Sequence, residues 1–212
     1  MCGFGSFRGH RIRSLAVVLV LLMLGMATAG KPVPILAQST SFAGQFLVAT
    51  DELRDPRFVR TVVYMVRHDA GGAMGLIVNR PLGDAPLSDL LQRLGLNGKG
   101  VAGEILVHYG GPVDAGRGFI LHTTDYKIES THVIKGGIAI TVQPEILQAI
   151  GAGTGPRRSL FALGYAGWSA GQLEGEIKAG AWITVPADEA LVFDENYESK
   201  WKRVMARRTI QL

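Results

Sequence analysis

Cysteine is almost missing from this sequence, because Cys2 is the only one among 212 residues. A disulfide within the chain and a zinc site built on several cysteines are therefore excluded. Histidine is also scarce: the five histidines form no His-Glu-x-x-His motif, and no two of them lie four residues apart. Because metal-binding histidines usually show such spacing, the sequence predicts no metal and no cofactor.

Charged residues make up only 19% of the chain, whereas hydrophobic residues make up 47%. This composition excludes wholesale disorder and predicts a sizeable apolar core. The 28 glycines follow no G-X-Y period, which excludes collagen and predicts many tight turns. No segment of 20–50 residues recurs, so the chain is not a repeat protein.

The net charge of +4 arises mostly at the N-terminus, where Arg8, Arg11 and Arg13 lie in 29 residues without Asp or Glu. The rest of the chain is nearly neutral, so no long-range attraction of polyanions is expected. A basic cluster near the C-terminus is interpreted as a solvated helix face. Because no DNA-reading motif accompanies it, a DNA-binding function is disfavoured. The members of the cluster are Lys200, Lys202, Arg203, Arg207 and Arg208.

Residues 1–29 have the layout of a secretory signal: a basic start, the apolar run Leu15–Met26 and the small residues of Ala27–Ala29. The apolar run is shorter than the roughly 20 residues that span a bilayer. We expect a leader over 1–29, a linker over 30–43 and one domain over 44–212. The protein would then be periplasmic, with membrane contact only through an uncleaved leader. Alternatively, translation starts at Met26 and the protein is cytoplasmic.

Short apolar runs bounded by turn residues predict more strands than helices. Strands are expected over 45–50, 61–66, 73–79, 104–109, 118–122, twice within 132–142, and over 159–165, 181–185 and 191–193. Helices are expected to begin at Pro86, Pro144 and Ser169, and a last one to carry Tyr197, Trp201, Val204 and Met205. The pattern predicts an α+β fold in a single compact domain, with a mixed, strongly bent β-sheet flanked by helices.

Gly167–Gly171 matches the G-x-S-x-G motif of hydrolases and lies between a predicted strand and a predicted helix. All five histidines precede Ser169, however, which is the opposite of the α/β-hydrolase order. A set of His122, Asp125 and Ser169 would be conceivable on another fold. Because Ser169-x-x-Gln172 also reads as a capping box, we interpret Ser169 as a helix N-cap worth about 1 kcal/mol.

A series of short motifs, in order from about Phe42 to Trp201, resembles the YqgE/AlgH family of bacterial proteins. They include Asp55-Pro56-Arg57-Phe58, Gly110-Gly111-Pro112, Gly164-Tyr165-Ala166-Gly167-Trp168, Gly171-Gln172-Leu173-Glu174 and Ala181-Trp182. The resemblance implies one compact α+β domain around a curved, barrel-like mixed sheet, and it implies no established reaction. The name of one family member derives from a proposed role in controlling alginate production, and by this naming alone the protein would be a transcriptional regulator. Family members resemble cytoplasmic proteins.

Polar and aromatic residues in the turns are the candidates for a functional site, because loops usually carry function. The ligand-binding candidates are Asp55, His68, Gly110, Gly111, His122, Trp168, Gln172, Glu174 and Trp182. One hypothesis is a non-enzymatic binding or regulatory domain. The other is an enzyme that uses His68 or His122 as general acid or base, with Asp55 or Glu174 to orient it.

We also expect three segments to meet at one rim of the sheet: the 110–112 turn, the strand end at His122 and residues 164–174. Glycines at 110, 111 and 164 would permit close backbone approach. A helix N-terminus beside an imidazole and an aromatic ring would favour a small anionic or polar ligand.

Overall fold

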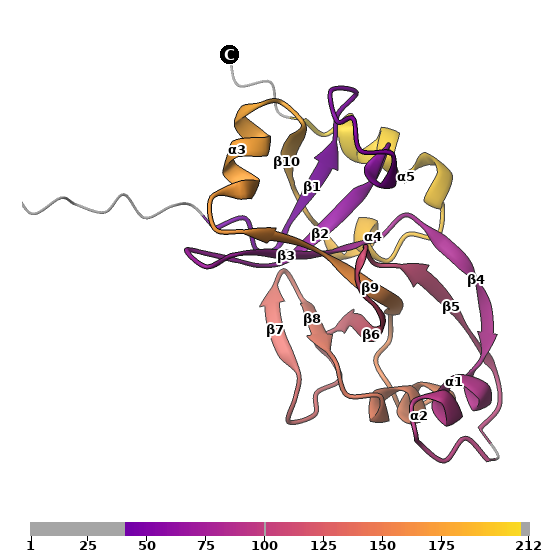
Figure 1. Ribbon diagram of the computed structural model, residues 1–212. Helices are drawn as coiled ribbons and strands as arrows, with labels where there is room; N and C mark the ends of the chain where they lie inside the picture. Colours follow the sequence, from indigo (N-terminus) through magenta and orange to yellow (C-terminus); the bar gives the residue numbers. More distant parts are fainter. Residues whose placement is uncertain (1–40, 100, 209–212) are drawn as a thin grey trace, which may run out of the picture. The chain divides into compact units, whose positions relative to one another are not determined.

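The computed structural model describes residues 41–99 and 101–208. The predicted leader and most of the predicted linker lie outside these residues. The described residues form one α+β domain with a curled sheet and helices around it, as predicted (Figure 1). No helix within the described ranges is long and apolar enough to cross a membrane.

In the part of the chain that the structure describes, ten strands form the sheet (Figure 1). They are β1 (Gln45–Ala49), β2 (Val62–Asp69), β3 (Gly72–Ile77), β4 (Pro81–Pro86), β5 (Glu104–Tyr109), β6 (Val113–Thr123), β7 (His132–Lys135), β8 (Ile138–Thr141), β9 (Ser159–Ser169) and β10 (Trp182–Pro186). Their order is β10-β1-β2-β3-β9-β6-β8-β7, with β5 on β9 and β4 on β5. All the pairs are antiparallel except β5 with β9, so the sheet is mixed, as predicted.

The long strand β9 joins the two halves of the sheet. Its last four residues pair with β3, whereas Phe161 and Ala162 pair with β5 on one edge and with β6 on the other. The chain that leaves β5 must therefore cross over β9 to begin β6. The turn Gly110-Gly111-Pro112 makes this crossing.

The crossing leaves no room for side chains. A Cβ at Gly110 would lie less than 3 Å from the carbonyl oxygen of Gly164, and a Cβ at Gly111 would clash with the backbone of Tyr165. Gly111 and Gly164 also have φ values of +151° and +70°, which disfavour any other residue. The predicted close approach of these glycines is confirmed.

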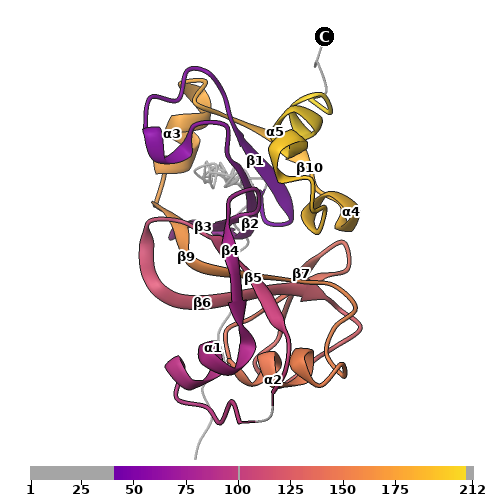
Figure 2. The same ribbon diagram turned by 90° about the vertical axis from the view of Figure 1, so that its right-hand side faces the viewer.

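Within residues 41–99 and 101–208, five short α-helices and one 3-10 turn surround the sheet (Figure 2). They are η1 (Pro56–Phe58), α1 (Leu87–Arg93), α2 (Glu145–Gly151), α3 (Gln172–Lys178), α4 (Glu189–Val192) and α5 (Tyr197–Met205). Helices α1 and α2 lie side by side over one apolar cluster, where Leu87 and Leu91 meet Ile146, Leu147 and Phe161. Helix α5 packs on β1 and β2, and α3 packs on β3, β9 and β10.

One predicted element is wrong, and one strand was not predicted. Residues 191–193 are not a strand, because Asp188 accepts a hydrogen bond from the Leu191 N–H at 2.8 Å and starts helix α4. Residues 81–86 form strand β4, which the prolines at both ends concealed from the sequence pattern. Because β4 lies at an edge of the sheet, these prolines cost no ladder bond on its free side.

Lys200 also departs from the solvated helix face that the sequence predicted. Its side chain is fully buried, and its Nζ donates hydrogen bonds to the carbonyl oxygens of Val78 at 2.8 Å and Val192 at 3.1 Å. Burial lowers the pKa of the Lys200 ammonium to about 8. Lys200 thus attaches α5 to the end of β3 and to α4.

Candidate functional site

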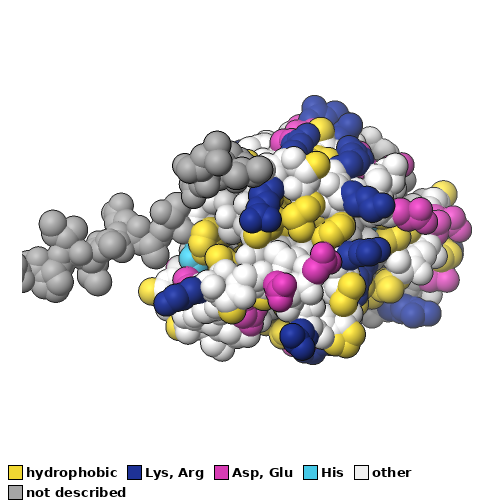
Figure 3. Space-filling model, turned by 90° about the horizontal axis from the view of Figure 1, so that it is seen from above, with side chains coloured by type: hydrophobic (Ala, Val, Ile, Leu, Met, Phe, Trp, Pro, Cys, Tyr) yellow, Lys and Arg dark blue, Asp and Glu magenta, His cyan; other side chains and the backbone are white. Residues whose placement is uncertain are grey.

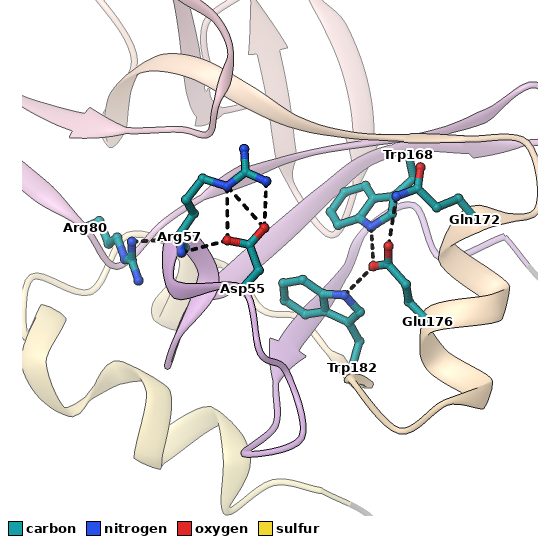
Figure 4. A network of polar contacts seen from close by, with 7 residues as sticks. All are labelled: Asp55, Arg57, Arg80, Trp168, Gln172, Glu176 and Trp182. Atoms are coloured by element: carbon teal, nitrogen blue, oxygen red, sulfur yellow. Dashed lines mark hydrogen bonds and ion pairs between the residues drawn. The ribbon is translucent and has the colours of Figure 1, made fainter.

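A cavity of about 260 Å³ lies where η1, the crossing turn, the end of β9, α3 and the start of β10 meet. It is lined by Leu53, Asp55, Arg57, Phe58, Pro112, Val113, Gly167, Trp168, Gln172, Glu176 and Trp182. We call it the tryptophan pocket. Four of the nine candidates from the sequence meet here: Asp55, Trp168, Gln172 and Trp182 (Figure 4).

The Glu176 carboxylate organises one side of the tryptophan pocket (Figure 4). Its Oε2 accepts hydrogen bonds from the indole N–H groups of Trp168 at 2.9 Å and Trp182 at 2.8 Å. Its Oε1 accepts from the Gln172 side-chain amide at 2.8 Å. The two indole rings meet edge to face with centroids 5.9 Å apart. Both tryptophans are therefore fixed in orientation by a single carboxylate.

An ion pair forms the other side of the tryptophan pocket (Figure 4). The Arg57 guanidinium donates to both carboxylate oxygens of Asp55, which also accepts from the Arg57 backbone N–H at 2.9 Å. These bonds hold the pKa of Asp55 below its usual value. Arg80 donates to the carbonyl oxygens of Arg57 and Val59, so η1 is attached to the segment between β3 and β4.

We expect Glu176→Ala to lower the free energy of unfolding by about 2–6 kcal/mol. The substitution leaves two buried indole N–H groups without acceptors, and each such group costs about 1–3 kcal/mol. Urea unfolding measured by tryptophan fluorescence checks this. Lys178→Ala, at an exposed position on the same helix, is the control and should change stability by less than about 0.5 kcal/mol. Equal effects of the two substitutions would contradict the proposed role of Glu176.

Two more candidates, His68 and Glu174, lie together outside the tryptophan pocket. The His68 Nε2 is 2.9 Å from Glu174 Oε1, and its Nδ1 accepts a hydrogen bond from the Phe42 N–H at 3.2 Å. Because Nδ1 accepts, Nε2 is the ring nitrogen that donates to the carboxylate. The His68 side chain is only 2% exposed. Its two hydrogen bonds connect β2 to α3 and to Phe42 at the start of the domain.

His122 does not reach the rim that the sequence predicted. It pairs with Ser159 at the start of β9, while Trp168 lies nine residues further along the same strand, roughly 30 Å away at 3.3 Å per residue. The His122 side chain is fully buried. Its Nδ1 donates to the Thr123 carbonyl oxygen, and its Nε2 accepts from the Thr141 hydroxyl, both at 2.9 Å. This part of the predicted rim is wrong because the register of β6 on β9 places His122 at the opposite end.

Ser169 is not the N-cap of α3, which corrects a second expectation. Ser169 remains in β9, paired with Gly72, and the helix begins at Gln172. A left-handed Gly171, with φ of +74°, separates strand and helix, and no side chain caps the helix. Only the reverse half of the capping box exists, since Gln172 accepts from the Ser169 N–H at 3.0 Å. Ser169→Ala therefore removes no cap.

Arg57, Arg80 and Glu176 are site residues that the sequence did not single out. The spacing of Gln172 and Glu176, four residues apart on one helix, is a signal that could have found Glu176. Arg57 follows the Asp55-Pro56 turn directly, but only the fold shows that it faces the pocket. Within the described residues, no group of three His, Cys, Asp or Glu side chains could hold a metal ion.

The protein is a single α+β domain with a curled half-barrel sheet, and the tryptophan pocket lies between elements of this domain. The AlgH-like family model matches residues 46–212, and the chain belongs to this family. A UPF0301 protein of Rhodospirillum rubrum is 45% identical over 164 residues, 77% of this chain and 85% of that protein. A UPF0301 protein of Caulobacter vibrioides is 46% identical over 166 residues, with the same coverage.

Solved structures are also similar to this chain. The solution structure of AlgH from Pseudomonas aeruginosa has a TM-score of 0.70 and 40% identity, and the match covers 85% of this chain and 93% of that chain. A crystal structure of a protein from Corynebacterium diphtheriae has a TM-score of 0.62 and 18% identity, over 80% and 88% of the two chains. The second similarity shows the fold alone.

Proposed function

We propose that this protein is a non-enzymatic domain that binds a small polar ligand in the tryptophan pocket. The convergence of Asp55, Trp168, Gln172 and Trp182 from separate parts of the chain carries this proposal. Glu176 and the Asp55–Arg57 ion pair hold these side chains in place before any ligand arrives. Such preorganisation lowers the entropic cost of binding.

The chemistry of the pocket supports a neutral polar or cationic ligand. Arg57 is paired with Asp55, which leaves the Glu176 carboxylate as the unbalanced charge among the lining residues. The anionic ligand predicted from the sequence has less support, because the imidazole expected to bind it, that of His122, lies at the far end of β9. A volume of 260 Å³ is just below the range of about 300–1,000 Å³ for small-molecule sites, so the ligand must be small.

The enzyme hypothesis has less support from the site. The lining residues of the tryptophan pocket include no histidine, cysteine or serine. The imidazole and carboxylate that do meet, His68 and Glu174, have both ring nitrogens hydrogen-bonded and the ring buried. The regulator hypothesis has less support too, because residues 30–212 are nearly neutral. The face in Figure 3 likewise mixes Lys and Arg with Asp and Glu. Protein surfaces that bind nucleic acids are usually predominantly basic.

A screen of small polar and cationic compounds by thermal shift tests the proposed function. We expect hits that raise the Tm of the wild type and lose at least tenfold in affinity in Leu53→Trp, which fills the pocket. The control Leu82→Trp, at a position 62% exposed outside the pocket, should bind normally. Hits that bind Leu53→Trp and the wild type equally would contradict this site, and so would a screen without any hit.

A further inference from the structure

A second, larger cavity crosses one face of the curled sheet. This groove has a volume of about 750 Å³ and receives side chains from β2, β3, β6, β7, β8 and β9. Its apolar part includes Met74, Phe119, Ile140, Val142 and Tyr165. Phe119 and Tyr165 meet edge to face with centroids 5.7 Å apart. The volume is that of a small-molecule site.

The ionised side chains of the groove are both cationic. Arg67 and Arg117 line it together with His132, and no Asp or Glu is among its lining residues. Arg67 is paired with Asp69 at 2.6 Å, outside the lining. The Arg117 guanidinium lies 5.3 Å from the centre of the Phe119 ring and forms no ion pair with the residues that the structure describes. Arg117 is therefore a cation at the border of the apolar surface.

We propose that the groove binds a small amphipathic carboxylate, with its apolar body on Phe119, Tyr165 and Ile140 and its head group on Arg117. The planar guanidinium forms two parallel hydrogen bonds with a carboxylate, and the apolar lining favours a hydrocarbon body over an inorganic anion. This site is separate from the proposed function, although Val113, Gly167 and Trp168 border both cavities.

Titration with decanoate below its micelle concentration tests this site, with amide shifts in NMR spectra as the readout. We expect saturable shifts at Phe119, Ile140 and Tyr165. The neutral 1-decanol and the cationic decyltrimethylammonium should bind at least tenfold more weakly. Equal binding of decanol and decanoate would reduce the groove to a non-selective apolar surface and overturn the proposal, as would the absence of decanoate binding.

Matched variants separate this site from the tryptophan pocket. Arg117→Gln and Val142→Asp should each weaken decanoate binding at least tenfold, the second by repulsion at an exposed border position. The controls are Arg57→Gln, in the tryptophan pocket, and Val133→Asp, which is 46% exposed and outside the groove. Both controls should retain wild-type affinity. Unchanged affinity in Arg117→Gln would overturn the proposal whether or not the tryptophan pocket binds a ligand.

Discussion

Gly111→Ala should lower the free energy of unfolding by more than about 4 kcal/mol, enough to leave much of the protein unfolded. The new Cβ would lie less than 3 Å from the backbone carbonyl of Tyr165, which belongs to the central strand and cannot shift freely. The φ of +151° at Gly111 adds backbone strain. Urea unfolding measures the effect. An insoluble product on expression would indicate a still larger loss of stability.

Gly116→Ala is the matched control for this crossing. Gly116 lies in β6, five residues further along the chain, and a Cβ there would meet no atom within 4 Å. We expect a change within about 0.5 kcal/mol, or slight stabilisation through the lower entropy of the unfolded chain. If Gly111→Ala unfolded at the same urea concentration as Gly116→Ala, the close crossing of the turn over β9 would be disproved.

The second large effect is a loss of stability between pH 6.5 and pH 4, which we attribute mainly to His108. Burial lowers the pKa of His108 to about 4, and the nearby ammonium of Lys200 acts in the same direction. Its Nδ1 is 3.3 Å from the Phe161 carbonyl oxygen, and its Nε2 has no hydrogen-bond partner in the described part of the chain. A proton on Nε2 would therefore be buried without an acceptor.

The sign follows from proton linkage. The folded state resists a proton that the unfolded state accepts from pH 6.5 downward, so the stabilisation is complete above pH 6.5 and is lost as the pH falls to about 4. A difference of this size corresponds to about 3 kcal/mol. Burial also lowers the pKa of His122, which adds a loss in the same direction.

Urea unfolding at half-unit steps from pH 4 to pH 7.5 checks this. Between pH 4 and pH 6.5, the slope of unfolding free energy against pH should be smaller in His108→Gln by the amount that corresponds to about one bound proton. The glutamine amide can still donate to the Phe161 carbonyl oxygen but does not titrate. The same substitution at the exposed His132 is measured in parallel as the comparison for a histidine at the surface. A wild-type slope in His108→Gln would refute the assignment.

Local patterns in the sequence were enough to determine most of the elements. Pro86 predicted the start of α1, and short apolar runs predicted β2 and β8. These patterns succeed because side-chain periodicity reflects burial directly. They failed at residues 191–193, where three apolar residues are too few to distinguish a strand from a helical turn. The glycines of the crossing were also identified from the sequence, because only glycine permits such backbone approach.

Register and burial were decided only by the tertiary structure. The pairing of β6 with β9 sends His122 away from the tryptophan pocket, although nothing in the local sequence of either strand fixes that alignment. Lys200 reads as one more surface cation until α5 is packed against Val78 and Val192, whose carbonyls receive its hydrogen bonds. Glu176 likewise becomes a site residue only when β9 and β10 bring Trp168 and Trp182 to the same carboxylate. A sequence lists donors and acceptors, but long-range packing alone determines which of them meet.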